Sequence, residues 1–169
     1  MKKTIMVLLT VFLFISCSST KKIEINSEKQ YEILLNNWEL EKLDLTLKDS
    51  ENFQDKEVLK KYKNLLQEKI KEKSALEEMM KKIKIQLENN DFEGIELYFD
   101  DSFINRKILS ELKKTDFSQM KIVYGKPEFY KDSAKNIVAV IYMDNVEYFQ
   151  FNYKLKNKKW SIMEIKNGR

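Results

Sequence analysis

The sequence predicts an α+β fold, with helices in the first part of the chain and an antiparallel sheet in the second. Between residues 27 and 114, apolar residues recur at the three-and-four spacing of amphipathic helices, whereas from Met120 onward they alternate with a period of two. The predicted strands are joined by short turns, which only antiparallel neighbours permit. Helices followed by such strands favour a fold in which the helices pack on the sheet.

The helical part is predicted to be a hairpin of two helices within residues 27–90. Ser27 is a candidate N-cap, because its hydroxyl can accept a hydrogen bond from an amide of the first turn. The helix after it is predicted to extend to about Leu47. Its apolar face begins with Tyr31, Leu34, Leu35 and Trp38. A longer helix is predicted from about Asp55 to Asn89.

Two arrangements of these helices remain open. Their apolar stripes can pack against one another and against the rest of the domain, or they can form a coiled coil with a partner. Lys69 and Lys73 interrupt the stripe of the longer helix, so a long continuous seam is disfavoured. The hairpin is therefore the prediction, and the coiled-coil partner is the alternative.

The stretch from Asn89 to Asp100 resembles an EF-hand calcium loop. Asn89, Asp91, Glu93, Gly94 and Asp100 fall on loop positions one, three, five, six and twelve. Aspartate at position twelve is too short for the usual bidentate grip, and position eight carries Glu instead of an aliphatic residue. We therefore expect a junction between helices capped by Asp91, and no metal site.

Residues 91–169 are predicted to form the sheet domain. A short helix from Asn105 to Lys114 should bury Ile108, Leu109 and Leu112. Four strands are then predicted over residues 120–130, 136–143, 146–155 and 158–165, with turns at 144–145 and 156–158. The second strand is apolar at successive positions, which predicts that both of its faces are covered. Its residues are Ile137, Ala139, Ile141 and Met143 on one face, and Val138, Val140 and Tyr142 on the other.

Composition excludes most familiar enzyme chemistries. The chain has no histidine and one cysteine, so Ser–His dyads and imidazole-bearing metal sites cannot be built. It has three glycines, and none of them forms a phosphate-binding loop. Carboxylates alone remain, for example Asp100 with Asp101 or Glu164, but an exposed pair does no general-acid work. We therefore predict no enzymatic activity and no cofactor.

Charge and hydrophobicity set further bounds. Hydrophobic residues make up 43% and charged residues 34% of the chain, which is enough apolar material for a folded core. Basic and acidic residues are interleaved along the sequence rather than segregated. A nucleic-acid-binding protein normally carries a basic stripe, so nucleic acid is not an expected partner.

The beginning of the chain predicts export and a lipid anchor. Lys2 and Lys3 precede an apolar run from Ile5 to Ile15, which is too short to cross a bilayer as a helix and is typical of a signal peptide. The residues Leu13, Phe14, Ile15, Ser16 and Cys17 then resemble the lipobox of bacterial lipoproteins. The resemblance implies cleavage after residue 16 and lipidation of Cys17.

Lipidation gives the protein a location and one partner, the membrane. Residues 1–16 would be the signal peptide and residues 17–26 a polar tether between lipid and fold. Two or three acyl chains anchor a protein stably, whereas one chain does so marginally. The resemblance also implies an outer-membrane location in a bacterium with two membranes, since Ser18 rather than Asp follows the cysteine.

The order of elements from about Ala75 onward resembles the nuclear-transport-factor-like cone fold. LENNDFEGIELYFDDSF is followed by a helix and four strands, the pattern on which the resemblance depends. It implies a cavity between sheet and helices, where the enzymes of this superfamily place His–Asp dyads that this chain cannot supply. Candidate lining residues, which are alternatively ordinary core residues, are Tyr124, Tyr142, Tyr148, Phe151 and Trp160.

Two functions from different classes follow. The first is a lipid-anchored, non-enzymatic binding module of the cell envelope for a small ligand or an envelope protein. The second is a structural or adhesive envelope component that assembles through its helical hairpin. An apolar cavity in the folded protein would favour the first, and a long exposed apolar helical stripe would favour the second.

Overall fold

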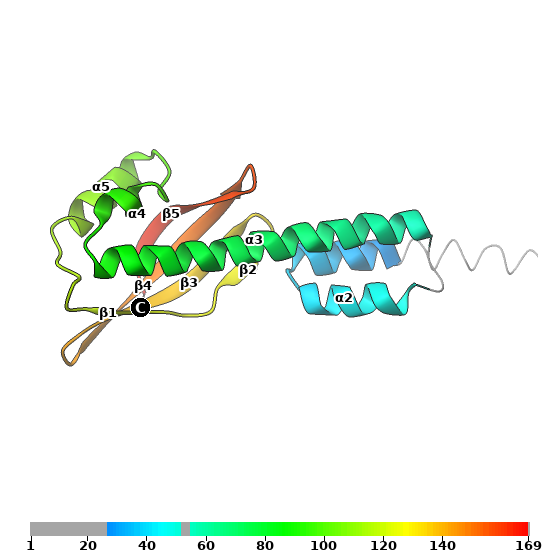
Figure 1. Ribbon diagram of the computed structural model, residues 1–169, viewed down its shortest axis with the longest axis horizontal. Coiled ribbons are helices and arrows are strands. Elements are labelled where there is room, and N and C mark those ends of the chain that lie inside the picture. The colour runs from blue at the N-terminus through cyan, green and yellow to red at the C-terminus, as the bar shows by residue number, and fades with distance from the viewer. Residues whose placement is uncertain (1–26, 52–54, 169) are drawn as a thin grey trace, which may run out of the picture. The chain divides into compact units, whose positions relative to one another are not determined.

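The computed structural model describes residues 27–51 and 55–168 (Figure 1). They form two units, one of the described residues up to Gln67 and one from Glu68 onward. Helix α3, Lys56–Glu88, contributes to both units. The sequence suggests a boundary after residue 90, just past the end of α3. The two units instead divide inside α3, after Gln67.

The first unit contains a helix over residues 27–36, helix α2 at Leu40–Asp49 and the start of α3. Its buried core is contributed by all three segments. The core residues are Tyr31, Leu34, Leu35, Leu40, Leu43, Leu47, Leu59, Tyr62 and Leu66. The sequence predicts a hairpin of two helices, whereas this unit contains three helical segments.

The extra break lies at Trp38, where the prediction of one helix to Leu47 is wrong. Trp38 has a φ of 57°, which a right-handed helix cannot contain. The Glu39 amide donates to the Leu34 carbonyl at 2.9 Å, and the Trp38 amide donates to that of Leu35 at 3.2 Å. This is the Schellman pattern of helix termination. The motif usually carries glycine at the left-handed position, so tryptophan there gives no sequence signal.

Tyr62 is fully buried in the core of this unit. Its ring packs against Tyr31 with centroids 5.0 Å apart. Its hydroxyl lies 3.5 Å from a Glu28 carboxylate oxygen and 3.4 Å from one of Glu32. Burial, followed by the negative charges of these two glutamates, raises the pKa of Tyr62 to about 12.

This shift predicts a loss of stability at alkaline pH. The folded pKa lies above the ordinary value of about 10, so the contribution of the neutral phenol is complete below pH 10 and is lost between about pH 10 and 12. Tyr62→Phe should melt close to wild type at pH 8 and decline less between pH 10 and 12. Lysines also deprotonate there, but they do so in both proteins. Parallel declines, followed by circular dichroism, would contradict the assignment.

The second unit is built on an antiparallel sheet. Its strands are β1 (Lys121–Tyr124), β2 (Glu128–Tyr130), β3 (Ser133–Tyr142), β4 (Asn145–Lys156) and β5 (Lys159–Asn167). The order is β1-β3-β4-β5, and β2 pairs with the first residues of β3. The predicted α+β class, helices followed by an antiparallel sheet, is confirmed.

Two local predictions about the strands need correction. Residues 120–130 form two strands instead of one, because the chain leaves the sheet between Gly125 and Pro127, and proline cannot donate to a ladder. The turn between β3 and β4 lies at residues 143–144, one residue earlier than predicted, with Met143 at a φ of 53°.

Helices of this unit lie on one face of the sheet, here called the inner face (Figure 1). The second half of α3 crosses it, and α4 (Phe92–Glu96) and α5 (Phe103–Leu112) lie beside β5. The inner face is buried where α3 covers it. Its most buried large apolar residues are Ile122, Val138, Phe151, Tyr153, Trp160 and Ile162.

The other face, here called the outer face, is not covered by any described element, so the prediction that β3 is covered on both sides is wrong. Ile137 on this face is 44% exposed and Tyr148 is 53% exposed. Ile141 is half-buried. The apolar residues of β3 therefore alternate between a covered face and a face that no described element covers.

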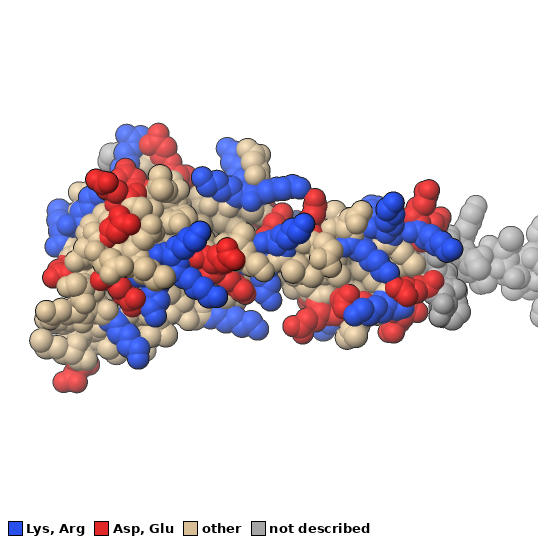
Figure 2. Space-filling model, viewed as in Figure 1, with Lys and Arg blue, Asp and Glu red and all other residues tan. Residues whose placement is uncertain are grey.

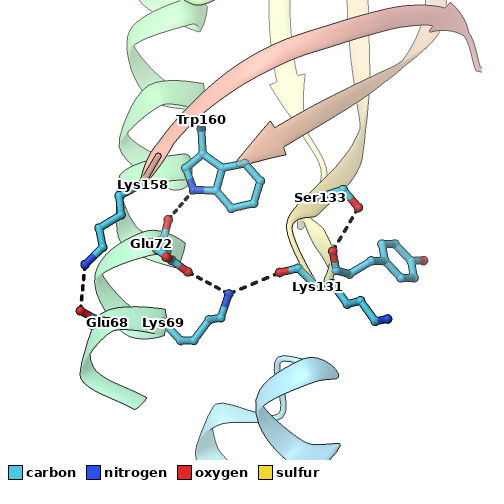
Figure 3. Close-up of polar contacts among 8 residues, drawn as sticks. Glu68, Lys69, Glu72, Lys131, Ser133, Lys158 and Trp160 are labelled. Atoms are coloured by element: carbon cyan, nitrogen blue, oxygen red, sulfur yellow. Dashed lines mark hydrogen bonds and ion pairs between the residues drawn. The ribbon is translucent and has the colours of Figure 1, made fainter. Parts of the chain in front are cut away.

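One end of the sheet is attached to α3 by polar contacts (Figure 3). The Trp160 indole donates to the Glu72 backbone carbonyl at 2.7 Å. Lys69 pairs with the Glu72 carboxylate at 2.9 Å and also reaches the Lys131 carbonyl at 3.3 Å. Lys158 pairs with Glu68, also at 2.9 Å. The lysine that interrupts the apolar stripe at position 69 thus connects helix and sheet.

Candidate functional site

A cavity of about 690 Å³ lies in the second unit between α5 and the inner face of the sheet. Apolar side chains make up most of its wall. They are Leu87, Ile108, Leu112, Phe117, Met120, Val138, Val140, Tyr142, Phe149, Phe151 and Ile165. The volume falls within the roughly 300–1,000 Å³ that small-molecule sites usually enclose.

The regular periods of helix and strand build this wall. Val138, Val140 and Tyr142 alternate along β3 and therefore share its inner face. Ile108 and Leu112 are four residues apart on α5 and lie one above the other on the helix side of the cavity. Lys107 and Glu111 form a second row with the same spacing.

Asn105 fixes the beginning of α5 to the sheet. It is fully buried, and its amide donates to the Ile162 carbonyl of β5 at 3.0 Å. Ser102 caps the helix by accepting from the Asn105 backbone amide at 3.2 Å. The Ile162 amide in turn donates to the Tyr98 carbonyl at 2.7 Å. These bonds hold the N-terminal end of α5 against β5, and the cavity lies along the remainder of the helix.

Charged side chains line part of the cavity. Lys166 pairs with Glu164 at 2.9 Å, and Glu111 pairs with Lys114 at 2.8 Å. The hydrogen bond from Lys114 is the main cause of a lowered pKa at Glu111, which therefore carries a negative charge at neutral pH.

Two further lining charges are not in an ion pair with any described residue. Lys107 stands on α5 and Glu147 stands on β4. They belong to opposite walls, one from the helix and one from the sheet. Each is exposed to solvent, so neither carries the cost of a buried unpaired charge.

The aromatic residues proposed from the sequence divide into three groups. Tyr142 and Phe151 line the cavity. Tyr124 is packed behind the wall, with its ring centroid 6.1 Å from that of Phe151. Burial raises the pKa of Tyr124, whose hydroxyl has no hydrogen-bond partner among the described residues. Tyr148 lies on the outer face, and Trp160 contacts α3 at another end of the sheet.

That the apolar residues of α5 border open space cannot be predicted from the sequence. Ile108 and Leu112 were expected in the core, but both line the cavity. Their spacing is the same whether a helix packs tightly or leaves a gap, because the pattern reports only which face is apolar. Only the placement of α5 against β5 reveals the difference.

In the loop that resembles an EF-hand, the polar side chains form hydrogen bonds with other groups of the protein. Asp91 caps α4 by accepting from the Gly94 amide at 3.0 Å. Asn90 donates to Asp116 at 2.7 Å, and the Asp100 carboxylate accepts from the Asn105 side chain. Within residues 27–51 and 55–168, no three carboxylate or thiol side chains gather as metal ligands do.

The candidate acids Asp100, Asp101 and Glu164 are engaged separately. Asp101 lies 3.2 Å from Arg106, and Glu164 pairs with Lys166. None of the three lines the cavity.

The predicted lipidation site, Cys17, lies outside the described residues. In the part of the chain that the structure does describe, no helix has both the length and the apolar character needed to span a bilayer. Compared with known proteins, the sequence matches no family model and no curated protein.

Proposed function

We propose that this protein is a lipid-anchored component of the cell envelope whose second unit binds a small ligand with an apolar body. The observation that carries the proposal is the cavity of about 690 Å³ between α5 and the sheet. An apolar ligand gains free energy by leaving water for such a site. The nuclear-transport-factor-like resemblance implies a cavity in the same place, between sheet and helices.

The residues that line the cavity favour binding over catalysis. Among the described residues that line it, Thr115 and Tyr142 supply the only hydroxyl groups, and none is a serine, cysteine or histidine. Its charged groups are exposed, whereas a catalytic acid or base needs burial or a close partner to tune its pKa.

A structural role through the helical unit has less support. Among its described residues, the first unit exposes Ile33 and Leu45 as large apolar side chains. Single exposed apolar residues are ordinary on protein surfaces, and they do not form a long stripe. We therefore place the function in the cavity.

Filling the cavity tests the proposal. Val140 points into the cavity, and its neighbour Ile141 points to the outer face. Val140→Trp should weaken the binding of the fluorescent probe 1-anilinonaphthalene-8-sulfonate by at least about tenfold, because the indole occupies the ligand's space. Ile141→Trp adds the same indole outside the cavity and should bind the probe like wild type.

The comparison requires that both variants fold. Circular dichroism and melting temperature establish this before any titration. Equal probe binding by folded Val140→Trp and Ile141→Trp would mean that the probe sits elsewhere, and the cavity would lose its assignment.

A further inference from the structure

The unpaired charges of the cavity define what kind of head group it can accept. Lys107 on α5 and Glu147 on β4 face the same cavity from opposite walls. An anionic head alone would meet Lys107 but would be repelled by Glu147 and Glu111. A cationic head alone would be attracted by Glu147 but repelled by Lys107. A head that carries both charges satisfies both walls.

The apolar wall defines the rest of the ligand. Seven of its side chains are purely aliphatic or thioether groups, which suit a flexible hydrocarbon. They are Leu87, Ile108, Leu112, Met120, Val138, Val140 and Ile165. A single alkyl chain fits this lining better than a polar molecule does.

The surface beside the cavity also suits an amphiphile. Tyr142 lines the cavity at the end of β3, and Met143 and Val146 follow at the hairpin tip, where Met143 is 76% exposed. The end of the unit that bears this hairpin shows mainly uncharged surface (Figure 2). Tyr142 and Met143 thus place apolar surface between the tip and the cavity wall, as expected for a ligand that leaves a lipid layer.

We propose that the cavity binds a single-chain amphiphile with a zwitterionic head, such as a lysophosphatidylethanolamine. The chain lies between α5 and the sheet, the phosphate faces Lys107 and the amine faces Glu147. This inference rests on the proposed function, because it names the ligand class of the same cavity.

Four probes with a twelve-carbon chain separate the possible head groups. They are lysophosphatidylethanolamine, lysophosphatidylglycerol, laurate and uncharged monolaurin, each titrated below its micellisation concentration by calorimetry. Lysophosphatidylethanolamine should bind about tenfold more tightly than each of the others. Shortening its chain from twelve to ten carbons should weaken binding by about tenfold, since each buried methylene contributes about 0.8 kcal/mol.

Charge-neutral variants assign the head group to its two partners. Lys107→Gln and Glu147→Gln should each weaken lysophosphatidylethanolamine binding by about five- to twentyfold and leave monolaurin binding within about twofold. Asp144→Asn is the matched control, because Asp144 is an exposed acid in the same hairpin that does not line the cavity. It should bind all four probes like wild type.

The outcomes separate this inference from the proposed function. If laurate or monolaurin binds as tightly as lysophosphatidylethanolamine, or if Glu147→Gln has no effect, the zwitterionic head is wrong while the cavity remains a ligand site. If no probe binds to the folded wild type, or if Val140→Trp binds them all unchanged, both the inference and the proposed function fail.

Discussion

Replacing Ile162 by alanine should reduce the free energy of unfolding by about 2–5 kcal/mol, while the same replacement at Ile141 should cost less than about 1 kcal/mol. Both isoleucines belong to one sheet: Ile162 lies in the middle of β5, and Ile141, which the sequence predicts to be covered, is the penultimate residue of β3. Ile162 is fully buried on the inner face, whereas Ile141 is half-buried on the outer face.

The difference arises from what surrounds each side chain. Removing three carbons from Ile162 leaves a void in the buried inner face, into which the surrounding side chains cannot fully collapse. Its backbone also bonds to Tyr98 and to Asn105, so a shift of β5 would disturb the segment that positions α5. At Ile141 water replaces the lost atoms, and only part of the apolar area is affected.

Chemical denaturation of the two variants measures this difference directly. A domain of this size has about 5–15 kcal/mol of stability in total, so Ile162→Ala should melt roughly 10 °C or more below wild type. Equal destabilisation by Ile162→Ala and Ile141→Ala would show that the outer face is covered in solution, and the distinction between the two faces would be wrong.

Cys17→Ser should abolish membrane anchoring. If Cys17 carries two or three acyl chains, each buried methylene holds the protein in the bilayer by about 0.8 kcal/mol, and loss of the thiol removes all of that free energy. The variant should lose palmitate labelling and leave the membrane fraction, or accumulate as the uncleaved precursor.

The neighbouring Ser19→Ala is the control, because it changes the tether without touching the thiol. It should remain labelled and membrane-bound. A Cys17→Ser protein that is processed normally and fractionates with membranes would contradict the lipobox interpretation. In a bacterium with two membranes, we expect the wild type in the outer-membrane fractions of a density gradient.

The elements that follow a single strong period could be predicted from the sequence. The sequence predicts a helix from Asp55 to Asn89, and α3 occupies Lys56–Glu88, because apolar residues keep the helical spacing on both sides of the interruption at Lys69 and Lys73. The long strands β3 and β4 followed from alternation and a short turn in the same way.

Features that depend on a single backbone conformation or on distant packing could not be predicted from the sequence. The left-handed Trp38 ends a helix without a glycine, and the covered face of β3 is decided by which side α3 packs on. Residues of the cavity were identified from the sequence only in part, namely Tyr142 and Phe151. Lys107 and Glu147 are 40 positions apart in the chain, and no sequence motif connects them.

Methyl NMR of the folded protein with twelve-carbon lysophosphatidylethanolamine tests the central claim, that the cavity is the ligand site. We expect shifts confined to methyl groups of the cavity wall, with none on the outer face. The responsive methyls should be those of Ile108, Leu112, Val138, Val140 and Ile165. Shifts confined to the outer-face methyls of Val123, Ile137 and Ile141, or to Ile33 and Leu45 of the first unit, would contradict it.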